Sequence, residues 1–325
     1  MKEKILKLLN ENGAVYLSGE QVSQILGISR TAVWKHIKAL KAAGYEIESI
    51  SNKGYRLKSA SSDLDALALK MMINQTNVVK AGYYFEQIDS TNQEAKRHAL
   101  SGQRINQLFV ADEQTAGRGR LGRTWASQRK EGLWFSLLLY PEIQPDQAST
   151  LTLVAASAMS KAIEKTTGLD VGIKWPNDLI LGRKKVCGIL TEMSAEINHL
   201  HYVIVGIGTN LGQMTFDDAL KDKATSIRAE GKSITAKALL EAFLETFEQD
   251  YNRFCQQDIS GVIEEQKKRS VTIGRRVCIT RGNEQLEAEA IDIDNEGKLV
   301  VRFDDGSVTA LFSGEISVRG INGYV

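Results

Sequence analysis

The chain has 325 residues, of which 42% are hydrophobic, and its formal net charge is +1. This is enough apolar material for two or three domains, and it excludes a uniformly polycationic protein. No apolar run approaches 18 residues, no signal-peptide pattern opens the chain, and the three widely spaced cysteines favour a reducing compartment, so we expect a cytoplasmic protein with no membrane partner.

Residues 1–58 are more basic than the rest of the chain. They contain ten Lys or Arg residues, five Glu and no Asp, a net charge of +5, which leaves −4 for the remainder. A small basic module on a mildly acidic body is typical of a protein in which one part contacts nucleic acid.

Three helices are predicted within residues 1–44. The second begins with a capping-box pattern at Ser18–Gln21 and ends at Gly27, which forms a turn. Ser29 can cap the third helix, which ends at Gly44. The buried stripe of the second helix is expected to contain Val22, Ile25 and Leu26.

A β-hairpin with a basic tip is predicted over residues 45–57. Two helices joined by a short Gly turn and followed by such a hairpin predict a winged helix-turn-helix that binds DNA. The alternative is a helical protein-docking domain with a solvated basic face. The candidate DNA-binding residues are Ser29, Arg30, Thr31, Lys35, His36, Lys38 and Lys53.

After a polar linker at about 59–65, a strand at Tyr83–Ile88 leads into a predicted helix ending near Leu100. Ser90, Thr91 and Asn92 stand at the start of this helix. They are suited to capping it, and they are equally suited to binding a polar or anionic ligand at its N-terminus. The sequence leaves both interpretations open.

The stretch Gln114–Trp125 alternates three glycines with three arginines and contains no acid. Glycine lets the backbone turn sharply and approach a ligand, and arginine binds phosphate or carboxylate through a planar pair of donors. We therefore predict an anion-binding loop that a ligand orders. The alternative is a mobile, solvated surface loop. The residues are Gly117, Arg118, Gly119, Arg120, Gly122 and Arg123.

The same stretch spells G-x-G-x-x-G from Gly117 to Gly122. A dinucleotide-binding interpretation requires a helix at the third glycine, whereas the pattern from Gly132 to Tyr140 predicts a strand. We reject that interpretation. The Walker pattern is also absent, because Lys followed by Ser or Thr does not follow the last glycine.

Alternating strands and helices are predicted for the rest of the central region. Lys174-Trp-Pro-Asn-Asp178 forms a turn between two strands, and Lys185 follows in the next turn; turn chemistry and solvation are the alternatives to a functional role. The predicted elements are a helix at about 145–167, strands at 171–174, 178–181, 186–193 and 201–208, and helices at 235–255 and 260–268.

Short strands separated by Gly, Asn and Asp turns predict a small β-barrel at the end of the chain, with strands at 277–280, 286–293, 298–303 and 308–312. The predicted fold class is α+β. It comprises a winged helix-turn-helix (1–60), a central mixed-sheet core with helices (61–270) and a small C-terminal barrel of the SH3-like kind (271–325).

Three blocks of sequence resemble those of a known family. Gly117–Trp125, Lys174–Asp178 and Lys185-Val-Cys-Gly-Ile-Leu190 are similar to blocks of biotin–protein ligases. The order of winged helix, core and barrel resembles the bifunctional ligases that also repress the biotin operon, and the resemblance covers essentially the whole chain.

The resemblance implies a two-step reaction. Biotin and ATP, with Mg²⁺, give biotinyl-5'-AMP, and biotin then passes to a lysine of biotin carboxyl carrier protein. It also implies operator DNA as a partner and a homodimer when biotinyl-AMP is bound. Two anions must meet in such a site, so cationic side chains are needed to offset their repulsion.

Site residues follow from the resemblance by position. Catalytic roles are implied for Arg118, Arg120, Lys185 and Asp178. Nucleotide contacts are implied for Arg123, Trp125, Asn177 and Asn210. Biotin contacts are implied for Ser90, Thr91, Asn92, Gln114, Arg118, Gly119, Arg120 and Lys185. The metal is supplied with ATP, and no protein ligands to it are implied.

The loop departs from some relatives at Leu121, where they carry another arginine, so its charge is smaller. Two alternatives remain at this stage. A lipoate–protein ligase shares the adenylation chemistry, and a transcription factor with a ligand-sensing domain needs no catalysis.

Overall fold

A computed structural model of the chain describes residues 1–13, 15–42, 44–59, 64–281, 284–312 and 316–320. The chain separates into two compact units, Met1–Gln75 and Thr76–Val325. The tail strands belong to the second unit together with the central sheet. The three predicted domain boundaries remain predictions.

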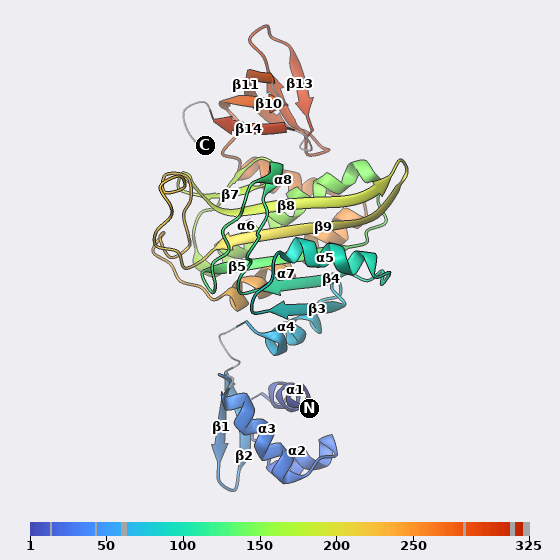
Figure 1. The fold of residues 1–325 in the computed structure, drawn as a ribbon, viewed down its shortest axis with the longest axis vertical. Coiled ribbons are helices and arrows are strands. Elements are labelled where there is room, and N and C mark those ends of the chain that lie inside the picture. Colours follow the sequence, from blue (N-terminus) through green and yellow to red (C-terminus); the bar gives the residue numbers. More distant parts are fainter. Residues whose placement is uncertain (14, 43, 60–63, 282–283, 313–315, 321–325) are drawn as a thin grey trace. The chain divides into compact units, whose positions relative to one another are not determined.

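The first unit has the predicted winged helix-turn-helix elements (Figure 1). The Ser18 side chain and the Gln21 side chain form the reciprocal capping box at the start of the second helix, and Gly27 ends it in the left-handed conformation. Val22 is buried, but Ile25 is 59% exposed, so its predicted place in the core is wrong. The elements are α1 (Lys2–Glu11), α2 (Gly19–Leu26), α3 (Arg30–Ala42), β1 (Glu46–Ile50), β2 (Gly54–Ser59) and α4 (Ala66–Ile73).

The hairpin β1–β2 is tied to the helices by its backbone. Tyr55 and Leu17 exchange backbone hydrogen bonds of 2.8 and 2.9 Å. Gly54 has φ +113°, and a Cβ there would lie 2.1 Å from the Leu17 carbonyl oxygen. Only glycine fits this close approach, so the position of the wing depends on it.

Helix α4 belongs to the first unit, although the predicted boundary at residue 60 places its residues with the central domain. Leu67 and Met71 pack against the core of the three helices. The Asp65 carboxylate caps α4 by accepting from the backbone N–H groups of Leu67 and Ala68 at 3.0 and 2.7 Å.

The second unit is built on a seven-stranded mixed sheet in the order β3-β4-β5-β9-β8-β7-β6. Only β3 and β4 are parallel, and every other neighbouring pair is antiparallel. The strands are β3 (Ala81–Phe85), β4 (Gln107–Ala111), β5 (Gly132–Leu139), β6 (Gly172–Lys174), β7 (Asp178–Leu181), β8 (Lys184–Glu196) and β9 (His199–Asn210).

Neighbouring residues of β5 point to opposite faces of this sheet. Ser136 contacts Thr91 and Asn92 at the start of α5 (Thr91–Leu100). Phe135 packs edge-on against Phe243 of α7 (Ala236–Cys255), with ring centroids 5.0 Å apart. Helix α5 therefore covers one face and α7 the other (Figure 1).

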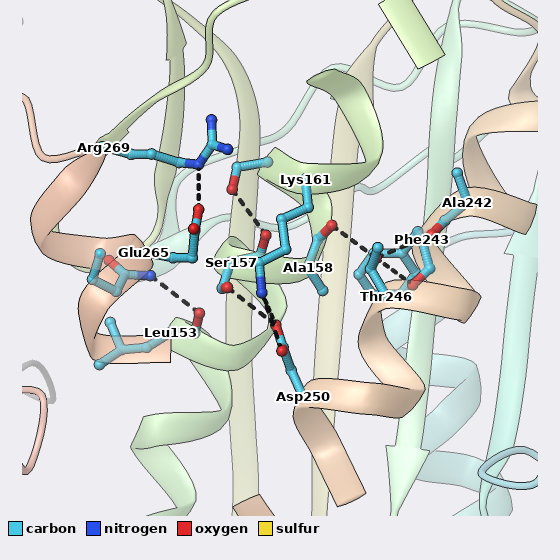
Figure 2. A network of polar contacts seen from close by, with 12 residues as sticks. Leu153, Ser157, Ala158, Lys161, Ala242, Phe243, Thr246, Asp250, Glu265 and Arg269 are labelled. Carbon is cyan, nitrogen blue, oxygen red and sulfur yellow. Dashed lines mark hydrogen bonds and ion pairs between the residues drawn. The ribbon is translucent and has the colours of Figure 1, made fainter. Parts of the chain in front are cut away.

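Helix α6 (Leu151–Thr167) packs beside α7, and a short 3₁₀ helix, η2 (Pro145–Thr150), precedes it where one continuous helix was predicted. Asp250 of α7 is 7% exposed and accepts from Ser157 at 3.1 Å and from Lys161 at 2.9 Å (Figure 2). Helix α8 (Ser260–Lys268) joins them through Gln266, which donates to the Leu153 carbonyl at 3.1 Å. These polar contacts satisfy groups that would otherwise be buried unpaired.

The tail forms a five-stranded antiparallel sheet in the order β13-β12-β11-β10-β14. The sheet fits the small domain that was predicted, but no pairing closes it into a barrel among the described residues. The strand β14 was not predicted. The strands are β10 (Arg275–Arg281), β11 (Glu284–Ile293), β12 (Leu299–Arg302), β13 (Val308–Leu311) and β14 (Ile316–Gly320). Among the described residues, none of the helices is both long and apolar enough to cross a membrane.

Candidate functional site

The N-terminus of α5 lies over the sheet and is closed off from solvent. Ser90, Thr91 and Asn92 are 2%, 2% and 5% exposed. Ser90 is the N-cap residue, yet its side chain makes no capping hydrogen bond. The Thr91 backbone N–H is instead satisfied by the Gln114 side chain, at 2.8 Å from Oε1. Capping therefore does not account for Ser90, which favours the ligand interpretation.

The stretch Gln114–Trp125, called the arginine loop below, forms a hairpin-like loop between β4 and β5. Trp125 donates its backbone N–H to the Gly117 carbonyl at 2.9 Å, and Gly119 donates to the Arg123 carbonyl at 2.7 Å. A Cβ at Gly117 would lie 2.4 Å from the Trp125 carbonyl oxygen, so only glycine fits there. Because β5 and not a helix follows the loop, the structure agrees with the rejection of a dinucleotide-binding motif.

The tip of the loop turns through the left-handed region. Leu121 has φ +56° and Gly122 has φ +72°. This conformation is unfavourable for leucine, and the Leu121 side chain is 63% exposed. At the base of the loop, Gln93 of α5, with its amide oxygen turned toward the guanidinium, accepts from Arg118 Nε at 3.2 Å and Nη2 at 2.8 Å.

The turn between β6 and β7 meets the arginine loop. Asn177 Oδ1 accepts from Arg120 Nη1 at 3.1 Å, and Asn177 Nδ2 donates to the Ile189 carbonyl at 3.0 Å. Burial lowers the pKa of the Arg120 guanidinium, and the Asp178 carboxylate partly offsets this. Arg120 remains charged at neutral pH, because a guanidinium is not deprotonated in proteins.

A second cation lies beside this contact. Lys185 Nζ is 2.5 Å from Asp178 Oδ1 and 4.9 Å from the centre of the Trp125 ring. The lysine and aspartate side chains are 22% and 14% exposed, so solvent screens the pair less than it would a surface ion pair. The lysine is thus held between a carboxylate and an aromatic face.

Three glycines in the strands form the floor beneath these side chains. A Cβ at Gly206 would lie 2.0 Å from Asn92 Oδ1, and one at Gly208 would lie 2.4 Å from Trp125 Nε1. A Cβ at Gly188 would lie 2.8 Å from Lys185 Nζ. The sequence analysis missed all three, although glycine inside an apolar strand is a known indication of close approach by another group.

One pocket brings most of the predicted site residues together. It is lined by Ser90, Thr91, Asn92, Gln114, Arg118, Gly119, Arg120, Trp125, Asn177 and Lys185, and also by Phe135, Gly188, Ile189, Leu190, Gly206, Ile207 and Gly208. Three predicted residues do not line it. Arg123 is exposed, Asp178 forms an ion pair with Lys185, and the Asn210 side chain donates to the Thr225 carbonyl at 2.9 Å.

The first unit has a second candidate surface, on α3 and the wing. Arg30, Thr31, Lys35, Lys38 and Lys53 are exposed and His36 is half-buried, whereas Ser29 accepts from the Ala32 backbone N–H and caps α3. The sequence analysis missed Trp34, which is 53% exposed and lies 5.4 Å from Lys38 Nζ. A groove between α3 and the wing includes Arg30, Trp34 and Asn52.

Three protein families match successive parts of the chain. The HTH domain matches residues 2–56, the Biotin/lipoate A/B protein ligase family matches residues 84–210, and the Biotin protein ligase C terminal domain matches residues 272–319. The order of these matches is the order of the elements described above.

Individual relatives match over longer stretches. The bifunctional ligase/repressor BirA of Bacillus spizizenii is 36% identical over 98% of this chain and 98% of its own. The biotin–[acetyl-CoA-carboxylase] ligase of Mycobacterium tuberculosis is 30% identical over 73% of this chain and 90% of its own. The structure of the Aquifex aeolicus biotin protein ligase in complex with biotin and ATP superposes with a TM-score of 0.63, at 29% identity, over 74% of this chain and 99% of that one.

Proposed function

The chain belongs to the family of bifunctional biotin–protein ligase/repressors. We propose which of its residues act in each reaction step and in repression. It activates biotin with ATP to biotinyl-5'-AMP and transfers biotin to a lysine of biotin carboxyl carrier protein. It also represses biotin biosynthesis genes, with biotinyl-AMP as corepressor.

The main support for the ligase assignment is the arrangement of the side chains that lie over the three strand glycines of the pocket floor. Asn92 lies over Gly206, and Trp125 and Lys185 lie over Gly208 and Gly188. One end of the pocket therefore offers hydroxyl and amide groups, and the other offers cations. A ligand with an uncharged hydrogen-bonding head and an anionic end fits this order. Biotin has a ureido head and a carboxylate, so we place the head near Ser90, Thr91 and Asn92.

In the first step the biotin carboxylate attacks the α-phosphorus of ATP and pyrophosphate leaves. Arg118, Arg120 and Lys185 would offset the repulsion between the two anions and stabilise the charge that develops on the phosphoryl oxygens. Arg120 is already oriented by Asn177, and Lys185 by Asp178 and Trp125. Such preorganised charges need little rearrangement during the reaction.

Mg²⁺ would enter bound to the phosphates of ATP. This cation keeps several water ligands and is usually held by substrate phosphates together with one or two carboxylates. No group of three or more His, Cys, Asp or Glu side chains suited to a metal occurs among the described residues. Bound there, Mg²⁺ would neutralise charge on the leaving pyrophosphate.

In the second step the carrier lysine attacks the mixed anhydride and AMP leaves. Asp178 is the carboxylate nearest to the cationic end of the pocket, and we propose that it assists deprotonation of that lysine. Its contact with Lys185 would have to loosen for this. Trp125 and Asn177 would contact the nucleotide. Arg123 and Asn210, which do not line the pocket, would do so only after the loop or the segment around Thr225 rearranges.

Exchange of labelled pyrophosphate into ATP tests the ligase assignment. We expect exchange that requires biotin and that lipoate does not support. Exchange with lipoate instead would make the chain a lipoate ligase. Biotin-dependent operator binding without any exchange would make it a non-enzymatic sensor.

The repressor function rests on the basic face of α3 and the wing. One winged helix covers only a half-site, and symmetric operators match two-fold proteins, so we propose that the chain binds its operator as a homodimer. Biotinyl-AMP would order the arginine loop and so remove an entropic cost from association through a surface at or near that loop. Carrier protein awaiting biotin would compete for the same surface.

A further inference from the structure

Helix α3 carries a large aromatic side chain on its solvent-facing side. The buried residues of the helix are Val33, Ile37 and Leu40. The Trp34 side chain, by contrast, is 53% exposed. Tryptophan is on average a well-buried residue, yet among the described residues the core of the first unit does not include Trp34. Packing therefore does not account for a tryptophan here, and the repressor function as described above gives it no role.

Cations flank Trp34 along the helix. Arg30 and Lys38 lie four residues before and after it, so the three side chains share one face. The Lys38 ammonium lies 5.4 Å from the centre of the Trp34 ring, a cation–π contact that restricts the ring. Helix α3 contains no Asp or Glu. This face therefore combines an apolar ring with positive charge, and its charge is complementary to that of a nucleic acid.

Trp34 lines the groove between α3 and the wing. Ile50 and Asn52 of the wing line the same groove. Among the described residues of that lining, Glu20 is the single carboxylate, and its Oε2 lies 3.9 Å from Arg30 Nη1. Both side chains are largely exposed, and an ion pair of this kind contributes little, so a phosphate can displace the carboxylate. The groove is thus open to an anionic partner.

The backbone that carries Trp34 is fixed at both ends of the helix. Ser29 Oγ accepts from the Ala32 backbone N–H at 3.2 Å and caps the start of α3. Lys41 Nζ donates to Ser49 Oγ at 2.8 Å and joins the end of α3 to β1. Trp34 is the fifth residue of α3. It lies in the N-terminal part of the helix, the part that contacts base edges in helix-turn-helix proteins.

An indole ring offers DNA a different contact from a lysine or an arginine. It has one N–H donor, which cannot replace the pair of donors that recognises guanine. The rest of the ring is apolar. In the major groove every base pair presents hydrogen-bonding groups, and thymine alone also presents a methyl group, which apolar side chains contact. The thymine methyl group is therefore the base feature that matches an exposed indole ring.

We propose that Trp34 is a specificity-determining residue of the DNA-binding unit, and that its ring contacts the C5-methyl group of a thymine in each half-site of the operator. Arg30 and Lys38 contact phosphates, which fixes the position of α3 without selecting a sequence. Trp34 adds selection for thymine at one position. The proposal rests on the repressor function and goes beyond it by naming the base feature that is recognised.

Replacement of thymine by deoxyuridine tests the proposal, because it removes the methyl group and keeps base pairing and charge. The operator is the duplex that the parent chain, with biotin and ATP, selects from a random pool, and each thymine is then replaced in turn. The transfer of one methyl group out of water corresponds to roughly a 4-fold change in affinity. At one position we expect this loss in each half-site, and so roughly 15-fold when both half-sites carry the replacement.

Trp34→Ala should bind the operator more weakly and should lose this sensitivity. Thymine and deoxyuridine at the sensitive position should then bind alike, because the two changes remove the same contact. The dependence of affinity on salt should stay the same, since no phosphate contact is lost. Ile25→Ala is the matched control, because it also removes an exposed apolar side chain of this unit but lies outside the groove. It should keep the parent's losses at every position.

A measurement on the parent chain does not depend on whether a variant folds. 5-Iododeoxyuridine places a photoreactive iodine where the thymine methyl group stood. Irradiation of the complex should join the sensitive position to Trp34, and mass spectrometry of the digested protein identifies the residue. Cross-linking to a different residue would overturn the proposal.

The outcomes distinguish this proposal from the repressor function. If the parent selects no sequence in the presence of biotin and ATP, the repressor function fails and the proposal fails with it. If the parent selects an operator but Trp34→Ala keeps the parent's loss at every deoxyuridine, the proposal alone is overturned. Equal weakening on all duplexes, together with a smaller salt dependence, would mean that Trp34 contacts the DNA backbone, which also overturns the proposal alone.

Discussion

Trp175 Nε1 donates a 3.0 Å hydrogen bond to the carbonyl of Gly297. The tryptophan is 2% exposed and lies in the turn between β6 and β7, two residues before Asn177. Gly297 lies in the turn between β11 and β12 of the tail. A second contact supports the first, since the Trp175 backbone N–H donates to Thr272 Oγ1 at 3.2 Å. The tail sheet thus holds the turn that presents Asn177 to Arg120.

Trp175→Phe should lower the stability of the second unit. A smaller aromatic ring replaces the indole, and a buried carbonyl loses its donor, which alone costs about 1–3 kcal/mol. The melting temperature and the rate of pyrophosphate exchange would be measured together, with the exposed Trp34→Phe as control. We expect exchange to slow as well, because Asn177 is then less firmly placed. A stability equal to that of the parent would show that this contact contributes nothing.

Arg120→Ala should leave the fold intact and shorten the retention of biotinyl-AMP. An arginine facing a phosphate makes charge-assisted hydrogen bonds that alanine cannot make, so we expect release roughly 10- to 100-fold faster. Arg129→Ala is the control, because Arg129 is exposed, pairs with Glu86 at 3.0 Å and does not line the pocket. Release of the intermediate is followed by stopped-flow fluorescence. If Arg120→Ala released biotinyl-AMP at the parent's rate, Arg120 would not contact the intermediate.

Cys187 should resist alkylation in the folded protein. Burial raises the pKa of its thiol to about 12, so almost no thiolate is present at pH 8. Labelling with a maleimide followed by mass spectrometry should modify the exposed Cys255 first. Labelling of Cys187 as fast as Cys255 would contradict the buried position.

The same shift predicts a pH dependence of stability. The unfolded thiol has a pKa near 9, below that of the folded one, so the neutral thiol is favoured in the folded state. Its contribution is complete below about pH 9 and is lost as the pH rises toward 12. Denaturant midpoints of the parent should fall over this range, and those of Cys187→Ala should fall less. Equal losses would assign the effect to other groups.

Removing residues 1–75 should abolish operator binding and leave pyrophosphate exchange at least partly intact. Every residue that lines the pocket lies in the second unit. A shorter deletion of residues 1–58 would leave α4 without the core against which Leu67 and Met71 pack. Complete loss of exchange in a folded 76–325 protein would mean that the first unit contributes to the active site.

The sequence predicts those parts of the site whose residues are contiguous in the chain. The arginine loop and the Lys174–Asp178 turn stand out because their glycines, prolines and charges are contiguous. The structure brings Arg120 and Asn177 of these two stretches into contact. The roles of the individual residues remain predictions.

The parts that the sequence does not predict depend on strand register. Gly188, Gly206 and Gly208 come together only because β8 and β9 pair in one particular register, and no local pattern encodes that pairing. Ile25 fits the helical period of α2, but its side of the helix is not covered by a neighbour. The period of the apolar residues predicts which face of a helix is buried, whereas packing against neighbouring elements determines how wide that buried face is.

The central claim is that the core synthesises biotinyl-AMP, which then promotes DNA binding. The most direct test measures operator binding and sedimentation velocity in one buffer, with and without biotin plus ATP. We predict that biotin plus ATP converts a monomer to a dimer and tightens operator binding by roughly 5- to 150-fold, the usual range of such coupling. Arg120→Ala should weaken both effects together. An unchanged sedimenting mass and an unchanged operator affinity would contradict the account.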